Sequence, residues 1–361
     1  MANLLDEASI LLTPTAYNNG SMLSVKPENG DGDFTFSRNS AATRVNAQGL
    51  VENVQILSSN LVSNGDFSQE GSELVTGTNS DMSGANSWVG GIGSLDFNIN
   101  TTVPNKMWCN FTSGNQQVKL DNVITANKTY LVSLSARLNS GTATTVQIGN
   151  FSSSQSDAGV LNITPTATTT TYSGYIVSDA NVNLSIGVIT ANNNGSDYEF
   201  DNISVKEVGQ DWSLNDSCFF TPIGINIKNT PSVGILSASG SSLLTIGNQY
   251  KMTYEITQNN NGSIKLASAV SEPMVSTVGT HTKYFTADQA AIRFIRDGVD
   301  VDVTIDNITI KEITEDTNLP RINYEGFSYD ANGDIIPNSG CGNWLLEPQS
   351  TNLITQSELF S

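Results

Sequence analysis

Two similar segments, 105 residues apart, constrain the fold of this chain more than any other feature. The first is Tyr198-Glu-Phe-Asp-Asn-Ile-Ser-Val-Lys-Glu-Val208, and the second is Val303-Thr-Ile-Asp-Asn-Ile-Thr-Ile-Lys-Glu-Ile313. Asp201 and Asp306 are equivalent, so the spacing is 306 − 201 = 105 residues. Both segments alternate apolar and polar residues, which is the period of a half-buried strand. A repeat of this length indicates duplicated domains rather than a short solenoid unit.

Other alternating segments occur in the same order before each copy of the repeat. They pair residues 128–137 with 249–256, 171–177 with 282–287, and 181–186 with 291–295. Short strands at this spacing, separated by Asn and Gly turns, predict antiparallel β-sandwiches. The best helix candidates, residues 4–12 and 288–292, are short. The sequence therefore predicts an all-β protein.

The repeat divides the chain into four predicted parts. Residues 1–57 form an N-terminal attachment and oligomerisation segment with a β-hairpin, and residues 316–361 form a C-terminal linker. Between them lie two antiparallel sandwiches of the jelly-roll type, module 1 (58–209) and module 2 (210–315). The opening of module 1, Ser59 to Phe67, is echoed by Thr351 to Phe360, so we expect a further module to follow.

Charge and composition exclude several classes of function. The chain has 16 Lys and Arg against 35 Asp and Glu, and its net charge of −19 makes nucleic acid a poor partner. No run approaches the roughly 18 apolar residues of a membrane span, and the N-terminus lacks the features of a secretion signal. Three widely separated cysteines, Cys109, Cys218 and Cys341, predict buried thiols rather than disulfides or a zinc site.

The module 1 pattern resembles jelly-roll carbohydrate-binding modules. The residues that carry the resemblance are Asn60-Leu-Val-Ser-Asn-Gly-Asp-Phe67, the alternating segment from Tyr130, and Phe200-Asp-Asn-Ile-Ser-Val-Lys-Glu-Val208. The resemblance covers roughly residues 58–208 and, more loosely, 210–314. It implies the sandwich fold and recognition of a host-surface glycan.

A second resemblance lies outside the modules, to phage head-fibre and tail-fibre proteins such as those of crAss-like gut phages and marine tailed phages. It is carried by Asp33-Phe-Thr-Phe-Ser-Arg38, by Ser40 to Glu52, and by Leu319-Pro-Arg-Ile-Asn-Tyr-Glu325 with Trp344 to Leu353. It implies a virion structural protein, a fibre or spike base assembled in the host cytoplasm. Its expected partners are capsid or tail proteins and further copies of itself, as a trimer.

Five residues are candidates for the assembly interface. Phe34 and Phe36 share one face of a predicted strand, and Arg38 and Arg44 are close in sequence before an Asn46 to Gly49 turn. Paired guanidinium groups can bind carboxylates or carbonyls of a neighbouring subunit bidentately. The alternative is a surface hairpin with solvated arginines. Trp344 belongs to the linker motif and is the fifth candidate.

Aromatic side chains are the usual platform for sugars, because a ring stacks on the apolar face of a pyranose. Trp88 lies in a Gly, Asn and Ser-rich stretch, which favours a loop or strand edge and a sugar contact. Structural packing is the alternative for this residue. Trp108 lies in a strand-like segment, which predicts a core position.

No cofactor is expected apart from a structural calcium ion, which the carbohydrate-binding resemblance maps onto Asp66 and Asp201. Carboxylate and carbonyl oxygens are the ligands that calcium prefers. The alternative is that Asp201 and Asp306 bond backbone amides in turns.

The sequence predicts a protein that is not an enzyme. His281 is the only histidine, so Ser-His-Asp or Cys-His catalysis would depend on a single residue. Two alternatives to the virion protein stay open: a bacterial surface carbohydrate-binding protein or adhesin, and a polysaccharide depolymerase using paired carboxylates.

Overall fold

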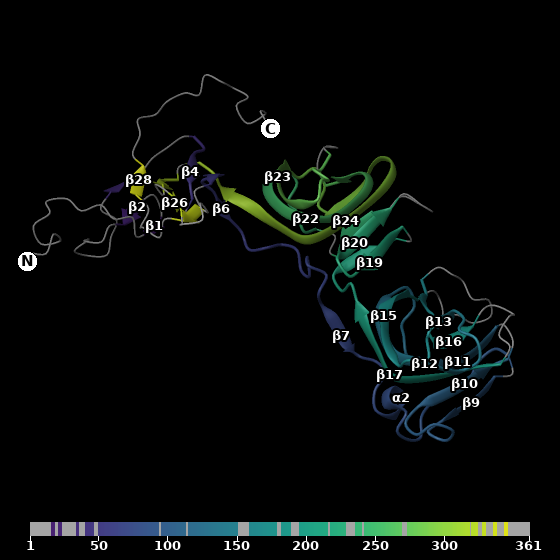
Figure 1. Cartoon of the computed structure of the whole chain (residues 1–361). Coiled ribbons are helices and arrows are strands. Elements are labelled where there is room, and N and C mark those ends of the chain that lie inside the picture. The colour runs from purple at the N-terminus through teal and green to yellow at the C-terminus, as the bar shows by residue number, and fades with distance from the viewer. Residues whose placement is uncertain are drawn as a thin grey trace, which may run out of the picture. The chain divides into compact units, whose positions relative to one another are not determined.

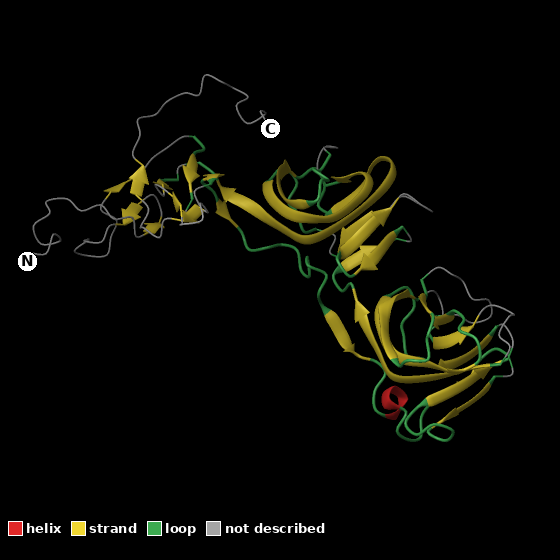
Figure 2. Cartoon of the chain, in the orientation of Figure 1, coloured by secondary structure: helices red, strands yellow, loops and turns green. Residues whose placement is uncertain are grey.

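The computed structural model describes residues 16–18, 21–23, 34–35, 40–46, 50–93, 95–112, 115–150, 159–178, 182–188, 195–215, 217–228, 235–239, 242–268, 273–317, 319–323, 327–329, 335–337 and 343–345. Strands make up 57% of the structure and helix 2%, which confirms the all-β prediction (Figure 2). Within the described ranges the helical part is one turn, α2 (Thr78–Asp81). No described helix is long and apolar enough to span a membrane.

The chain divides into two compact units. Unit 1 contains residues 1–61, 248–251 and 311–361, and unit 2 contains residues 62–247 and 252–310. The N-terminal and C-terminal stretches, which the sequence separates by two modules, thus belong to the same unit. Most residues of both modules belong to unit 2.

Unit 1 is built from short antiparallel strands (Figure 1). They are β1 (Ala16–Asn18), β2 (Ser21–Leu23), β3 (Phe34–Thr35), β4 (Thr43–Val45), β5 (Val51–Asn53), β6 (Ile56–Leu57), β25 (Arg321–Asn323), β26 (Phe327–Tyr329), β27 (Ile335–Pro337) and β28 (Asn343–Leu345). β4 and β5 pair around the predicted turn, with Arg44 opposite Glu52, so the expected N-terminal hairpin is present. β25 pairs with β28 and sets Ile322 opposite Trp344, which brings together the two parts of the C-terminal motif.

Module 1 has two antiparallel sheets. The first has the order β15 (Thr170–Val177), β12 (Thr129–Ser140), β17 (Ser196–Val208), β10 (Met107–Phe111), β9 (Asp96–Ile99), and β7 (Glu70–Glu73) also pairs with β17. The second has the order β14 (Leu161–Ile163), β13 (Val146–Gly149), β16 (Leu184–Val188), β11 (Gln116–Leu120), β8 (Trp88–Gly90).

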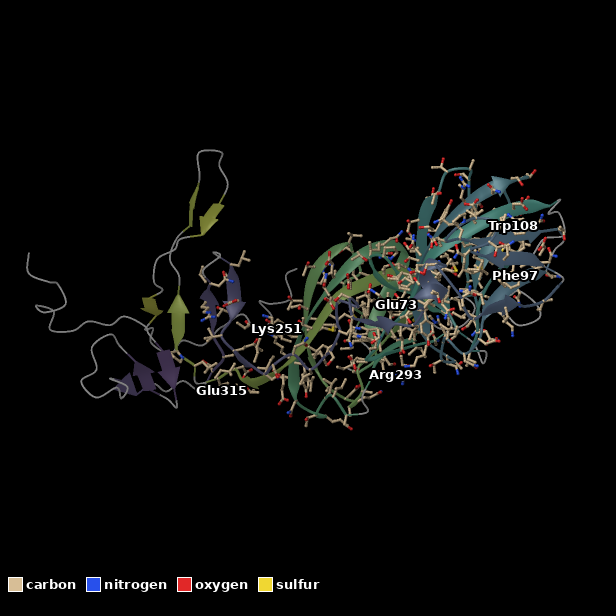
Figure 3. The ribbon with its side chains drawn as sticks, turned by 90° about the horizontal axis from the view of Figure 1, so that it is seen from below. Glu73, Phe97, Trp108, Lys251, Arg293 and Glu315 are labelled. Atoms are coloured by element: carbon tan, nitrogen blue, oxygen red, sulfur yellow. The ribbon has the colours of Figure 1, made fainter. Side chains whose placement is uncertain are left out.

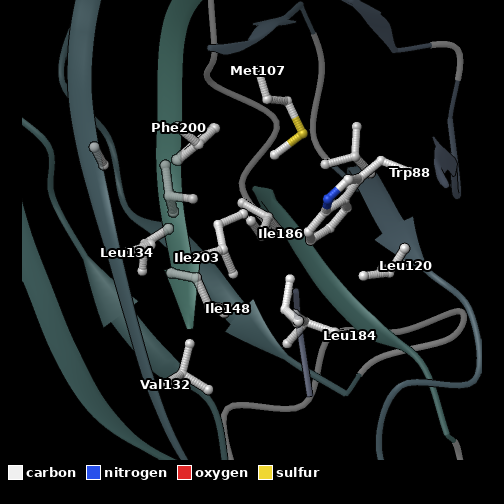
Figure 4. Close-up of a cluster of buried hydrophobic side chains, with 14 of the residues drawn as sticks. Trp88, Met107, Leu120, Val132, Leu134, Ile148, Leu184, Ile186, Phe200 and Ile203 are labelled. Carbon is white, nitrogen blue, oxygen red and sulfur yellow. The ribbon is translucent and has the colours of Figure 1, made fainter. Parts of the chain in front are cut away.

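Alternating side chains from both sheets enclose one apolar core (Figure 4). Val132, Leu134 and Phe200 come from the first sheet, and Ile148 and Ile186 from the second, and all five are completely buried. Burying a side chain of this size contributes roughly 1.5–3 kcal/mol. The period-two pattern of these strands is therefore explained by packing of each sheet against the other.

Module 2 repeats this all-β organisation around one long strand. Its strands are β18 (Trp212–Leu214), β19 (Cys218–Thr221), β20 (Gly224–Lys228), β21 (Ile235–Ala238), β22 (Gln249–Leu266), β23 (Gly279–Thr286) and β24 (Arg293–Glu315). β24 pairs with β21 near its beginning and with β20 further along, where Ile225 lies opposite Ile305. Tyr250, Met252 and Ile256 of β22 are buried in its interior.

The segment that opens module 1 contacts module 2. In unit 1, β6 pairs with the end of β24, with Leu57 opposite Ile313. In unit 2, Ile308 N donates to Gly65 O at 2.8 Å. The Phe67 ring packs edge-on against Trp212, with 5.1 Å between centroids. Residues predicted to begin module 1 thus run along the last strand of module 2.

Candidate functional site

Trp88 and Trp212 lie in the interior, and their indole nitrogens are hydrogen-bonded. Trp88 is 5% exposed, and its Nε1 donates to Asn79 O at 3.0 Å. Trp212 Nε1 donates to Asn64 O at 2.9 Å. Buried Trp nitrogens usually find such a partner. Figure 4 shows Trp88 among core side chains, so its ring offers no face to a sugar and the packing alternative describes it.

Trp108, labelled in Figure 3, differs because the burial pattern of its strand places it outside the core. In β10, Met107, Cys109 and Phe111 are completely buried in the core, so the alternating residues Trp108 and Asn110 lie on the outward face of the first sheet. Trp108 is half-buried. In the described part of the chain no group accepts a hydrogen bond from its indole nitrogen. The prediction that Trp108 lies in the core is wrong.

The register of four strands places Trp108 in a row of polar residues. It lies opposite Asn98 of β9 on one side and opposite Glu199 of β17 on the other. Glu199 also lies opposite Arg137 of β12, and Arg137 Nη2 donates to Glu199 Oε1 at 2.7 Å. Directly opposed residues have Cβ atoms roughly 4.5–5.5 Å apart. The ring and the ion pair are therefore neighbours.

Further polar residues extend this row in both directions along the strands. Asn110 lies opposite Asp197, and Asp197 Oδ2 accepts from Ser140 Oγ at 2.8 Å. On the other side, Lys106 contacts the carboxylate of Asp201. We term this surface the Trp108 face, and its residues are Asn98, Lys106, Trp108, Asn110, Arg137, Asp197, Glu199 and Asp201.

Several buried polar atoms of the Trp108 face have no hydrogen-bond partner among the described residues. They are Asn110 Oδ1, Arg137 Nε, Asp197 Oδ1 and Asp201 Oδ1. Leaving such an atom unsatisfied costs roughly 1–3 kcal/mol, so water or a ligand is expected to bond it. Acceptors and a donor thus surround an aromatic ring, an arrangement suited to a ligand with both apolar and hydroxyl surfaces.

The two aspartates predicted to share a calcium ion have different surroundings. Asp66 is exposed and accepts from Ser68 Oγ at 2.8 Å, whereas Asp201 contacts the Lys106 ammonium group. Asp66 is instead close enough to Asp306 to raise its pKa, after the larger effect of burial. The described residues contain no group of three or more carboxylate, His or Cys side chains suited to a metal ion. The residues do not fit a calcium site shared by this pair.

The predicted assembly residues are only partly described. Arg44 donates through Nε to Glu52 Oε1 at 2.8 Å, so its guanidinium binds a carboxylate of its own hairpin. Phe34 and Trp344 lie in β3 and β28, which are described by their backbone. Phe36 and Arg38 lie outside the described residues. The interface role of all five residues stays a prediction.

No protein-family model matches the chain, and no curated protein matches it in sequence. Solved structures with a similar arrangement include the tandem CBM22-1–CBM22-2 domain of Paenibacillus barcinonensis Xyn10C. It is 10% identical, with a TM-score of 0.34 over 68% of this chain and 99% of that one. A structure described as "CBM4 structure and function" is 14% identical, with a TM-score of 0.25 over 40% of this chain and 99% of that one.

A viral structure is also similar, that of the Sulfolobus Turreted Icosahedral Virus. It is 12% identical, with a TM-score of 0.21 over 57% of each chain. At these identities and TM-scores we infer no function from any of the similar structures.

Proposed function

We propose that this protein is a non-catalytic glycan-binding protein, and that the Trp108 face binds the saccharide. The observation that carries the proposal is the outward-facing Trp108, whose indole nitrogen has no partner among the described residues, beside buried donors and acceptors that also lack described partners. The indole nitrogens of the buried Trp88 and Trp212 are bonded, so among the three tryptophans with described side chains Trp108 is the one placed to stack on a ligand.

Each part of the face has a role in this proposal. The Trp108 ring packs on the apolar face of a pyranose, as aromatic rings in ligand sites do. Asp197 and Asp201 accept hydrogen bonds from sugar hydroxyls, and Arg137 donates one through Nε. Glu199 holds the Arg137 guanidinium in place through their 2.7 Å contact. Because the site is an open sheet face with one ring, we expect a dissociation constant of roughly 1 mM for one site, equivalent to about −4 kcal/mol.

A glycan array with the intact chain, followed by calorimetry on the best ligand, tests this proposal. Trp108→Ala should lower affinity about tenfold or more, and Trp108→Phe should retain part of it. Tyr284→Ala is the matched control, because Tyr284 is an exposed aromatic (41%) in module 2. Binding that is unchanged in Trp108→Ala, or absence of any glycan ligand, would overturn the proposal.

We further propose that the protein acts as a fibre or spike base in a phage particle, as a homotrimer assembled through unit 1. Two features support this: the fibre-protein resemblance of Asp33 to Arg38 and Ser40 to Glu52, and the pairing of β25 with β28, which joins separate parts of the C-terminal motif. Light scattering of the purified chain tests the trimer. A monomer that binds no capsid or tail protein would favour the alternative, a bacterial surface adhesin with the same glycan face.

A further inference from the structure

The internal repeat makes it possible to locate the counterpart of the Trp108 face in module 2. Phe200 of β17 corresponds to Ile305 of β24, because 305 − 200 = 105. Phe200 lies opposite Met107, and Ile305 lies opposite Ile225, so β20 is the counterpart of β10. The next step along each pair of strands sets Trp108 opposite Glu199 and sets Asn226 opposite Thr304.

The aromatic residue of this second row lies one strand further out. Phe219 of β19 is opposite Asn226, just as Asn98 is opposite Trp108 in module 1. In module 1 the aromatic residue lies on β10 and the amide on the outer strand β9, whereas in module 2 the amide lies on β20 and the aromatic residue on the outer strand β19. Phe219 is 38% exposed, whereas the residues on either side of it are buried, so its ring points outward.

Asn226 is held rigidly beside this ring. It is 6% exposed, and because Ile225 and Ile227 are completely buried in the core, its side chain points to the outward face. Its Nδ2 donates to Asp302 Oδ1 at 2.8 Å and to Thr304 Oγ1 at 3.0 Å. With both bonds fixing the amide, its Oδ1 is left buried without a partner among the described residues.

The charges around the second row differ from those of the first. Thr304 takes the place of Glu199, and Thr257 Oγ1 donates to Ile223 O at 2.7 Å and lies 3.5 Å from Thr304 O. The nearest ion pair, Lys228 with Asp302 at 3.3 Å, lies two residues along the strands, and its Asp302 carboxylate also accepts from Asn226 Nδ2. The row itself consists of an aromatic ring, an amide and hydroxyl groups, and the carboxylate bonded to it, Asp302, is paired with Lys228, so this surface has no net charge.

We propose that module 2 carries a second saccharide-binding face, formed by Phe219, Asn226 and Thr257 above the completely buried Thr304, that takes an uncharged sugar. The inference rests on the proposed function of the Trp108 face and extends it. Phe219 stacks on the sugar ring, and the unpartnered Oδ1 of Asn226 accepts a hydrogen bond from a hydroxyl. Two such faces in one chain give a higher avidity for a repetitive glycan than either face alone.

Saturation-transfer NMR and calorimetry on the intact chain test this proposal with neutral gluco-, xylo- and manno-oligosaccharides as probes. The starting protein is Trp108→Ala, in which the first face has lost its ring. We expect this protein to retain binding to a neutral oligosaccharide, and a second change, Phe219→Ala, to weaken it about tenfold, the equivalent of 1.4 kcal/mol. Tyr284→Ala in the same background should leave it unchanged.

Phe219→Leu separates loss of the ring from loss of folding, because it keeps most of the apolar volume and is expected to weaken binding as Phe219→Ala does. If Trp108→Ala alone removes all saccharide binding, the second face does not exist and the proposed function stands. If Phe219→Ala removes binding while Trp108→Ala does not, the second face stands and the first is wrong. If Phe219→Ala in the Trp108→Ala background leaves saccharide binding unchanged, the second face is wrong.

Discussion

Asn202 and Asn307 adopt the same left-handed backbone conformation, with φ of 51° at each, and are separated by 307 − 202 = 105 residues. In β17 this conformation coincides with a bulge, because Ser133 and Ser135 of β12 lie opposite Ser204 and Asp201. Asn is the residue that tolerates a positive φ best after Gly. The repeated Asp-Asn pair therefore marks a bend in the strand, and the following residues Ile203 and Ile308 return to the core.

The first prediction concerns this bend. Replacing Asn307 by Ala should lower the free energy of unfolding by about 1–2 kcal/mol, because Cβ-bearing residues other than Asn are strained at positive φ. Asn307→Gly should have a much smaller effect, because Gly adopts this conformation freely. Chemical denaturation of both variants measures the difference. Equal destabilisation by Ala and Gly would show that the Asn307 contact with Glu255, rather than the backbone, is responsible.

The fold class could be predicted because apolar and polar residues alternate along each strand, and this alternation is visible within the strand's own sequence. The same signal was present at Trp108, since Lys106, Trp108 and Asn110 share one parity and Met107, Cys109 and Phe111 share the other. Reading that parity would have placed Trp108 outside. For Trp88 the Gly-rich neighbouring sequence indicated an exposed position, whereas the structure encloses the residue between the two sheets.

The sequence patterns could not predict which distant segments pair with one another. Glu199 and Arg137 are 62 residues apart, and their contact depends on the register of β12 against β17. The contact of Gly65 with Ile308 is likewise non-local. Alternation predicts which face a residue occupies but contains no information about which strand lies next to it.

The second prediction tests the segment that runs along β24. A Cβ at Gly65 would lie 1.9 Å from Ile308 O, a backbone atom that cannot move aside easily. Gly65→Ala should therefore destabilise module 2 by roughly 2 kcal/mol or more, through the clash and the lost backbone bond. Gly90→Ala is the control, because its nearest neighbour, Phe97 Cε1, would be at an ordinary 3.6 Å. A normal melting temperature for Gly65→Ala would show that this segment does not dock as described.

The third prediction concerns pH. Burial raises the pKa of the Asp306 carboxyl above its ordinary value of 3.8, and the carboxylates of Glu255 and Asp66 raise it further. The folded protein then holds this proton more tightly than the unfolded chain, so stability falls as the pH rises from about 3.8 through the raised pKa. Asp306→Asn removes the charge and retains an oxygen that can accept from Asn307 N, as the carboxylate does at 2.8 Å.

We therefore expect Asp306→Asn to melt at a higher temperature than the wild type at pH 7, with the difference disappearing near pH 3. Asp300→Asn, at an exposed position, controls for the change in net charge. Calorimetric melting of the three proteins between pH 3 and pH 8 measures this. A stabilisation by Asp306→Asn that is constant across that range would contradict the electrostatic explanation.

The fourth prediction uses the buried thiols as reporters of the module cores. Cys109 is completely buried and Cys218 is 4% exposed, and burial raises the pKa of the Cys109 thiol far above its usual range. Because the thiolate is the reactive form, alkylation requires opening of the sandwich. In a Cys341→Ser background, which removes the remaining thiol, iodoacetamide at pH 8 should leave Cys109 and Cys218 unmodified in the native protein. Both cysteines should react in guanidinium chloride, and mass spectrometry measures the modification. Modification of Cys109 at the rate of a free thiol under native conditions would refute its placement in the core.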